Sequence, residues 1–364
     1  MKFSFRLLAI VAGVLVLSRT AHAQTPFISP SATPTTVGST VPANGDVNPY
    51  GIIVVPASSG NLVLGNILIS NFNASTNQQG TGSTIVQITP GGVNTLFAKI
   101  VSDNACTGGV GLSTALAIVQ NKFVVVGSLP TSDGTSATAK AGCLIVLDDT
   151  GAVVDTFTGF GINGPWDMTA IDQGSKSLLF VSNVLNGTVA AGGKVVTKGT
   201  VLRLTMDFSR GAPRITKHTI IGDGFPERTD PAALVIGPTG LGLASNGTLY
   251  VADTLASRIA AIPNAMKRGN SAHLGTTIVQ GGALFAPLGL AIAPNGDILT
   301  VNANDGSLVE STTAGTEFAP VNLDKTAAPP ADPGAGTLFG LAVAPGGTGV
   351  YFVDDGSNTL NLLN

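Results

Sequence analysis

Residues 238–253 read PTGLGLASNGTLYVAD, and residues 287–302 read PLGLAIAPNGDILTVN, so the two stretches align without a gap. Residues 338–354 (LFGLAVAPGGTGVYFVD) repeat the pattern with one extra residue. Residues 49–71 and 165–183 are looser copies with insertions, and residues 114–127 match by position only. A unit that recurs at this spacing predicts a repeat architecture, in which every copy is one supersecondary element.

The equivalent point of each copy is the residue before a large apolar residue, at Gly51, Ala115, Asp167, Gly240, Gly289 and Gly340. The successive intervals are 64, 52, 73, 49 and 51 residues, which is enough for four short strands. In the fifth copy we expect these strands over residues 288–293, 297–302, 307–311 and 317–323. The breaks between them carry glycine, which supplies the positive φ of tight hairpin turns.

Six such antiparallel units, each with an apolar first strand near an axis, predict an all-β, six-bladed β-propeller. A solenoid is the alternative. The last copy ends at Asn364 after a third strand over residues 358–363, one strand short. Residues 35–41 (TTVGSTV) are predicted to supply the missing strand and to close the ring, which removes exposed edges. We therefore expect one domain over residues 35–364.

The first 23 residues have the three parts of a cleaved export signal. Lys2 and Arg6 precede an apolar run over residues 7–17, and the sequence AHA ends at Ala23. We expect cleavage after Ala23, a flexible lead-in over residues 24–34, and a secreted or periplasmic product. No later stretch has the roughly 18 uninterrupted apolar residues of a membrane span, so membrane insertion is not expected.

The charge of the chain bears on its partners. Loss of the signal leaves 15 basic and 21 acidic residues, a net charge of −6. A negative chain repels phosphate backbones, so nucleic acid is not an expected partner. RNA binding stays open as a third functional class, which requires Lys194, Lys198 and Arg203 to form one basic face.

Two cysteines, Cys106 and Cys143, are predicted to form a disulfide in an oxidising compartment. Cys106 lies in the loop that enters the second copy, and Cys143 begins its third strand, so the bond would staple the most degenerate copy. The alternative, a catalytic thiol, needs a neighbouring base. The mature chain has only His218 and His273, which we expect on the surface.

Residues 249–259 (LYVADTLASRI) resemble the core of an NHL repeat, in which a strand end of this kind precedes an Arg-Ile pair. The similarity extends to about five of the six copies, although the fifth and sixth lack the arginine. The resemblance implies a six-bladed propeller, related to the gluconolactonase and regucalcin type, the strictosidine synthase-like proteins and the amidating lyase. Asp253 is expected to pair with Arg258 inside its own blade.

In the gluconolactonase-like relatives, metal ligands are acidic or Asn residues just before the Gly-Leu of the inner strands, facing the channel mouth. The residues at these places here are Tyr50, Thr114, Trp166, Thr239, Leu288 and Phe339. None is a carboxylate or an amide, whereas calcium needs several oxygen ligands, so we expect no metal and no other cofactor. A second ring of polar residues at the strand ends is interpreted as turn-stabilising: Asn71, Asn183, Asp253, Asn302 and Asp354.

The predicted mouth is rich in large side chains, with Tyr50 and Trp166 beside Leu288 and Phe339. The chain has only one Trp and three Tyr, so their placement there is unusual. A concave aromatic opening with a few polar neighbours predicts a binding funnel for a small molecule or sugar. The polar neighbours are Asp46, Asn48 and Asp167. The alternative is that the bulky residues plug the channel.

Connections between the second and third strands are long only in the first three copies, at residues 72–83, 128–142 and 184–199. These polar loops are expected to rim the same entrance. The leading hypothesis is an exported, monomeric binding or scaffolding module for an unknown small molecule, sugar or protein. The runner-up is a lactonase, hydrolase or lyase on the same fold, with or without a metal, and with catalytic residues not identified. Convergence of Asp46, Asn48, Asp167 and a fourth oxygen ligand on one point would favour the enzyme.

Overall fold

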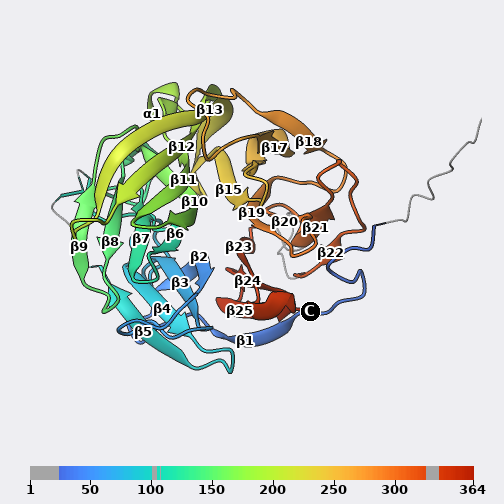
Figure 1. The fold of residues 1–364 in the computed structure, drawn as a ribbon, viewed down its shortest axis with the longest axis horizontal. Helices are drawn as coiled ribbons and strands as arrows, with labels where there is room; N and C mark the ends of the chain where they lie inside the picture. Colours follow the sequence, from blue (N-terminus) through green and yellow to red (C-terminus); the bar gives the residue numbers. More distant parts are fainter. Residues whose placement is uncertain (1–23, 101–104, 107, 325–335) are drawn as a thin grey trace, which may run out of the picture.

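The structure is a computed structural model that describes residues 24–100, 105–106, 108–324 and 336–364. Its strands form six antiparallel sheets arranged in a ring around a central axis, as Figure 1 shows. The six-bladed β-propeller predicted from the repeats is confirmed. The expected export signal, residues 1–23, lies outside the described residues.

Blades 1 to 3 are built in chain order from the axis outward. Blade 1 contains β2 (Val47–Val54), β3 (Ile67–Asn73), β4 (Thr84–Ile88) and β5 (Asn94–Lys99). Blade 2 contains β6 (Leu116–Val119), β7 (Phe123–Ser128), β8 (Cys143–Leu147) and β9 (Val153–Phe157). Blade 3 is larger and has five strands, β10 (Gly164–Gln173), β11 (Lys176–Val184), β12 (Val196–Asp207), β13 (Arg214–Asp230) and β14 (Leu234–Ile236).

Blades 4 to 6 follow the repeat more closely. Blade 4 contains β15 (Pro238–Leu243), β16 (Leu249–Asp253), β17 (Arg258–Ile262) and β18 (Thr276–Gln280). Blade 5 contains β19 (Pro287–Ile292), β20 (Ile298–Asn302), β21 (Ser307–Ser311) and β22 (Val321–Asn322), so the expected fourth strand is shorter than predicted. Blade 6 contains β23 (Leu338–Val343), β24 (Val350–Asp354), β25 (Thr359–Leu363) and, from the other end of the chain, β1 (Thr35–Ser39).

The ring is closed by pairing of the two ends of the chain. β1 runs antiparallel to β25, with Thr35 opposite Leu362 and Ser39 opposite Thr359, so the closure predicted for residues 35–41 is confirmed. The segment before β1 also contacts the ring. The backbone N–H of Ile28 donates to a carboxylate oxygen of Glu310 at 2.8 Å, and the Ile28 side chain is buried between blades 5 and 6.

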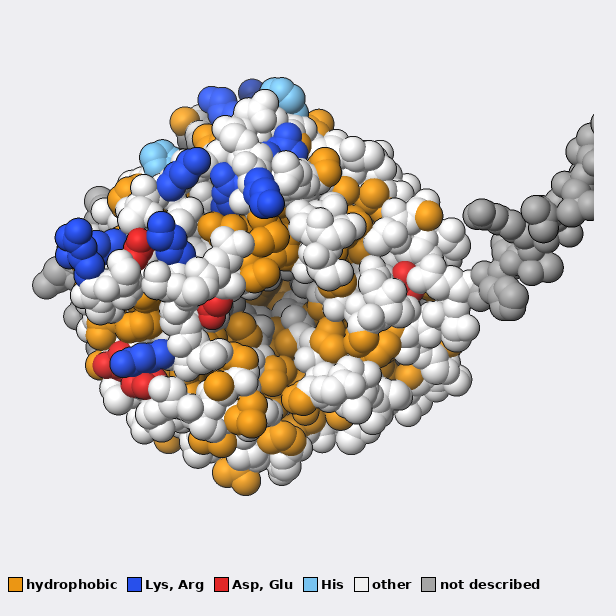
Figure 2. Space-filling view, in the orientation of Figure 1, with side chains coloured by type: hydrophobic (Ala, Val, Ile, Leu, Met, Phe, Trp, Pro, Cys, Tyr) orange, Lys and Arg blue, Asp and Glu red, His pale blue; other side chains and the backbone are white. Residues whose placement is uncertain are grey.

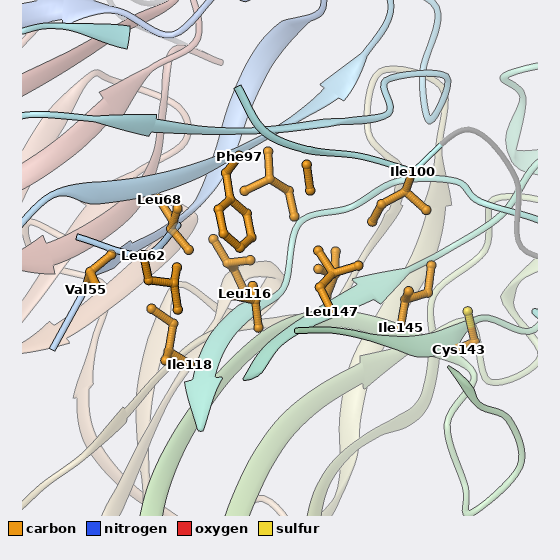
Figure 3. Close-up of a cluster of buried hydrophobic side chains, with 14 of the residues drawn as sticks. Val55, Leu62, Leu68, Phe97, Ile100, Leu116, Ile118, Cys143, Ile145 and Leu147 are labelled. Carbon is orange, nitrogen blue, oxygen red and sulfur yellow. The ribbon is translucent and has the colours of Figure 1, made fainter. Parts of the chain in front are cut away.

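The hydrophobic core is divided among the spaces between neighbouring blades. One cluster combines β3, β4 and β5 with β6, β7 and β8, and Figure 3 shows its side chains, including Leu68, Phe97, Leu116 and Ile145, meeting between the two sheets. Both faces of a strand are therefore buried. In β24, Val350 and Phe352 pack toward blade 5, while the alternate residues Tyr351 and Val353 pack toward blade 1. This explains why the middle strands are almost continuously apolar.

The repeat motif has a structural cause in the inner pair of strands. Its proline and its strand-end Asp or Asn are cross-strand partners, as in Pro238 with Asp253 and Pro287 with Asn302. The pairing register shifts just after the proline in both pairs. Such a bulge bends the strand and re-aims the next side chains.

The motif glycines are required by a close approach between inner strands of neighbouring blades. A Cβ on Gly289 would overlap the carbonyl oxygen of Phe339, and a Cβ on Gly340 would overlap that of Tyr50. Gly240 stands in the same relation to Leu288. The backbones around the axis are therefore too close for any side chain at these three positions.

The predicted disulfide between Cys106 and Cys143 is confirmed, and its sulfur atoms are 2.08 Å apart. Cys143 is the first residue of β8, the third strand of blade 2. The bond attaches the loop that enters this blade to its third strand. Blade 2 therefore has a covalent constraint where its repeat sequence is weakest.

We predict that Gly289→Ala lowers the free energy of unfolding by about 2 kcal/mol or more, because the added methyl group meets backbone that cannot rotate away. Gly269→Ala is the matched control, since a Cβ there would meet no atom within 4 Å. Chemical denaturation of both variants measures the difference. Equal stabilities would contradict the close approach of the inner strands.

Candidate functional site

The candidate site is a cavity of about 370 Å³ at the end of the ring where the loops between second and third strands lie. Its walls include five of the six residues that precede the equivalent points, namely Tyr50, Thr114, Trp166, Leu288 and Phe339. We call it the mouth cavity. The sixth residue, Thr239, is fully buried, and its hydroxyl forms a hydrogen bond of 2.8 Å with that of Thr254.

Aromatic rings form one continuous wall of the mouth cavity. Tyr50 stacks on Phe339 with ring centroids 5.2 Å apart. Phe72, from the end of β3, and Trp166 each meet this pair edge-on at 6.0 Å. The indole Nε1 of Trp166 donates a 2.9 Å hydrogen bond to the Tyr50 hydroxyl, so these two rings are held in fixed orientation. Tyr50 and Trp166 are almost fully buried, and both line the mouth cavity.

Three buried polar atoms in this wall have no hydrogen-bond partner within the described parts of the chain. They are the Thr114 hydroxyl oxygen, Gln79 Oε1 and Asp355 Oδ1. Thr114 lies just before β6, Gln79 in the long loop of blade 1, and Asp355 just after β24. An unpaired buried polar atom costs about 1–3 kcal/mol, so three around one cavity mark a place where an added partner would be stabilising.

Asp355 is the principal ionisable group of the cavity. Its Oδ2 accepts a hydrogen bond of 3.1 Å from the Asn48 amide, while Oδ1 is the unpartnered atom. Burial, followed by the repulsion of neighbouring Asp354, raises the pKa of Asp355 to about 7. Asn48 has a left-handed backbone conformation (φ 62°). Its backbone N–H donates a hydrogen bond to Asn358 Oδ1, which stabilises this conformation. Both protonation states of Asp355 are accessible near neutral pH.

A second wall comes from the hairpin of β13 and β14, which extends blade 3 over the mouth. Arg228 and Asp230 line the cavity and form an ion pair with a nitrogen–oxygen distance of 2.7 Å. The other Asp230 oxygen accepts the backbone N–H groups of Ala232 and Ala233. This pair carries no net charge.

Asp167 lies on the other side of the aromatic wall. It lines a separate cavity of about 300 Å³ along the axis, formed mainly by apolar residues of the inner strands, and Tyr50 borders both cavities. Asp167 occupies an equivalent point that is glycine in four copies. Its carboxylate accepts the N–H of Met168 at 2.8 Å and that of Leu241 at 3.1 Å, and so joins blades 3 and 4. Burial raises the pKa of Asp167 to about 7.

Asp46, Asn48 and Asp167, the expected polar neighbours of the mouth, make their contacts in three different places. Asp46 is buried and accepts hydrogen bonds from the backbone N–H of Ser83 and from the Thr84 hydroxyl, which anchors the start of β4. Asn48 is in the mouth cavity, and Asp167 is in the axial cavity. In the described chain, no group of three His, Cys, Asp or Glu residues is placed to hold a metal ion.

Three of the five strand-end residues, Asn183, Asn302 and Asp354, accept backbone N–H groups of nearby loops, as interpreted from the sequence. Asn183 Oδ1 accepts the backbone N–H groups of Asn163 and Gly164, and Asn302 Oδ1 accepts that of Phe285. Each side chain thus holds the loop that enters its own blade. In blade 4 the predicted pair is present, with Arg258 Nη2 2.7 Å from Asp253 Oδ2.

The basic face considered for RNA binding lacks one of its three residues. Arg203 is only 4% exposed and donates to the Ala265 carbonyl at 2.7 Å, so it cannot join Lys194 and Lys198 in one surface. Figure 2 shows a central hollow rimmed by hydrophobic side chains, with most of the visible Lys and Arg side chains at the upper left of the view, around blade 3. His218 and His273 are exposed, as expected, and His273 pairs with Asp223.

Sequence reasoning missed Gln79, Asp355 and the Arg228–Asp230 pair. Asp355 follows the strand-end residue Asp354, and these two consecutive acidic residues are the feature of the sequence that could have indicated it. Gln79 lies inside a loop whose position was predicted but whose path was not. The β13–β14 hairpin departs from the repeat and carried no signal.

Comparison with known proteins supports the fold. No family profile matches the chain, and no curated protein matches it by sequence. Among solved structures, a gluconolactonase from Xanthomonas campestris is similar with a TM-score of 0.57 and 13% identity, over 94% of this chain and 95% of that one. A virginiamycin B lyase from Staphylococcus aureus has a TM-score of 0.50 and 14% identity, over 92% and 99%. At such low identity the likeness shows a shared propeller fold.

The part of the chain that is described contains no helix long and apolar enough to cross a membrane. The short helical elements, such as α1 (Thr188–Ala191), lie in loops between strands.

We predict that the protein is less stable at pH 8 than at pH 5.5. Burial raises the pKa values of Asp167, Glu227 and Asp355 to about 7, whereas carboxyl groups of an unfolded chain titrate near pH 4. Between about pH 4 and 7 the folded chain therefore binds more protons than the unfolded chain, and the free energy of unfolding falls as pH rises.

Thermal unfolding across this range tests the prediction. Asp355→Asn is expected to flatten the pH dependence, while Asp172→Asn, at an exposed position, is expected to leave it unchanged. A melting temperature that increases from pH 5.5 to pH 8 would show that these carboxyl groups are not desolvated.

Proposed function

We propose that the protein binds a small, hydroxyl-bearing organic molecule, such as a sugar, in the mouth cavity. One observation carries the proposal: three unpartnered buried polar atoms line the same cavity as four aromatic rings. Rings supply apolar contact area, and a few placed polar groups supply orientation, which is the usual composition of a ligand pocket. A volume of about 370 Å³ suits a ligand of one or two rings.

We also propose that the protein acts outside the cytoplasm after residues 1–23 are removed, and that it is a monomer. The disulfide between Cys106 and Cys143 supports this address, because such bonds persist in oxidising compartments. A role as a scaffold for another protein is the alternative if no small molecule binds.

The binding prediction uses Trp166, the one tryptophan of the chain, as a reporter. Among hexoses, polyols and lactones, a true ligand should shift Trp166 fluorescence and raise the melting temperature. Thr114→Val keeps the side-chain shape but removes the hydroxyl, so we expect affinity to fall about fivefold to tenfold, the value of one hydrogen bond. Calorimetric titration measures this loss.

Thr216→Val is the matched control, because Thr216 is exposed on β13. Truncation of Trp166 is a poorer test, since this 4% exposed side chain belongs to a buried cluster and its loss would open a cavity. This binding mode is excluded if no compound of the panel binds, or if Thr114→Val binds the ligand with the wild-type affinity.

A second candidate is an enzyme of the hydrolase or lyase type, and Asp355 is the observation that favours it. A carboxyl group with a pKa of about 7 at a cavity wall can accept or release a proton near neutral pH. The names of two similar structures, a gluconolactonase and a lyase, make lactones and cyclic esters reasonable first substrates. The described lining of the cavity holds no group of three His, Cys, Asp or Glu side chains placed for a metal ion.

If the protein is an enzyme, Asp355→Asn should reduce turnover by at least about 100-fold, because removal of a general acid or base typically costs that much. Binding of substrate, measured by Trp166 fluorescence, should persist in this variant. If the variant keeps its turnover, Asp355 has no catalytic role, and the site is then a binding site only.

A further inference from the structure

We infer that the mouth cavity selects an organic cation, a small molecule with a protonated amine on an apolar or hydroxylated body. The inference rests on the proposed function, because it assumes that this cavity binds a ligand. It adds the charge and the hydrogen-bonding character of that ligand.

The unpartnered polar atoms of the mouth cavity can all accept hydrogen bonds. Gln79 Oε1 and Asp355 Oδ1 are acceptors, and the Thr114 hydroxyl oxygen can accept as well. A complementary ligand must therefore present donors. An ammonium group carries three N–H donors and no acceptor, so it matches this set better than a carbonyl or a carboxylate does.

The second argument is the aromatic wall beside Asp355. Tyr50, Phe72, Trp166 and Phe339 all line the cavity, and their centroids are linked by contacts of 5.2 to 6.0 Å. The faces of aromatic rings attract cations, most strongly in sites from which water is excluded. Rings together with one carboxylate form a cage that suits an amine with an apolar body.

The third argument is the charge balance of the lining. Arg228 is neutralised by Asp230 at 2.7 Å, and Asp230 is also fully hydrogen-bonded. Asp355 is the one charged residue of the described lining without a cationic partner. Asp354, the last residue of β24, is a neighbouring acid, and Asp167 lines the axial cavity that Tyr50 also borders. Every uncompensated charge in the described lining is therefore negative.

The test compares two molecules of the same shape, cyclohexylamine and cyclohexanol. We expect the wild-type protein at pH 8 to bind the amine at least tenfold more tightly, by calorimetry and by Trp166 fluorescence. Asp355→Asn should lower the affinity for cyclohexylamine at least tenfold more than the affinity for cyclohexanol, and so abolish this preference. Asp223→Asn, which removes an exposed carboxylate near His273, should keep the preference and serves as the control.

The pH dependence of binding by the wild-type protein is a second test, and it requires no variant. Because Asp355 loses its proton at about pH 7, the preference for the amine should grow between pH 6 and pH 8. The Asn48 amide donates to Asp355, Asp354 repels its charge, and the Arg228–Asp230 ion pair lines the same cavity.

The outcomes separate this inference from the proposed function. Equal affinity for amine and alcohol would overturn the inference and leave the binding function in place. Tighter binding of cyclohexanecarboxylate than of cyclohexylamine would also overturn the inference, and it would indicate that Arg228 recognises the ligand. Absence of binding by both probes, together with silence across the hydroxylated panel, would overturn the inference and the proposed function together.

Discussion

The close approach of the inner strands is the constraint on which the rest of the structure depends. At Gly240, Gly289 and Gly340 the backbone of one blade touches the carbonyl group of the next, so the axis has no room for side chains there. The residues just before Gly289 and Gly340 are Leu288 and Phe339, and both line the mouth cavity. The close approach of the inner strands therefore fixes the backbone from which part of this lining projects.

Two copies escape this constraint, and they make the ring asymmetric. Ala115 and Asp167 stand where the other copies have glycine. The Asp167 carboxylate accepts a hydrogen bond from the N–H of Leu241, and this bond links blades 3 and 4. Its raised pKa follows from this burial, and so does part of the expected pH dependence of stability. A structural role accounts for Asp167 without any ligand.

The polar features of the mouth come from elements outside the regular repeat. Gln79 is supplied by the long loop of blade 1, Arg228 by the β13–β14 hairpin and Asp355 by the turn after β24. The propeller provides rigid strand ends, while these loops decide which atoms face the cavity. This division explains how the gluconolactonase and the lyase share the fold with this chain at 13–14% identity.

The sequence by itself determined the ring, because glycine, proline and strand-end Asp or Asn recur at positions that local backbone geometry requires. It also determined the disulfide, the closing strand and the Asp253–Arg258 pair, each of which follows from the place of a residue within its repeat. Only the tertiary structure decided which polar atoms share a cavity. Gln79, Thr114 and Asp355 belong to blades 1, 2 and 6, and no periodic pattern relates them. Their convergence depends on the paths of loops, which the strand repeat does not constrain.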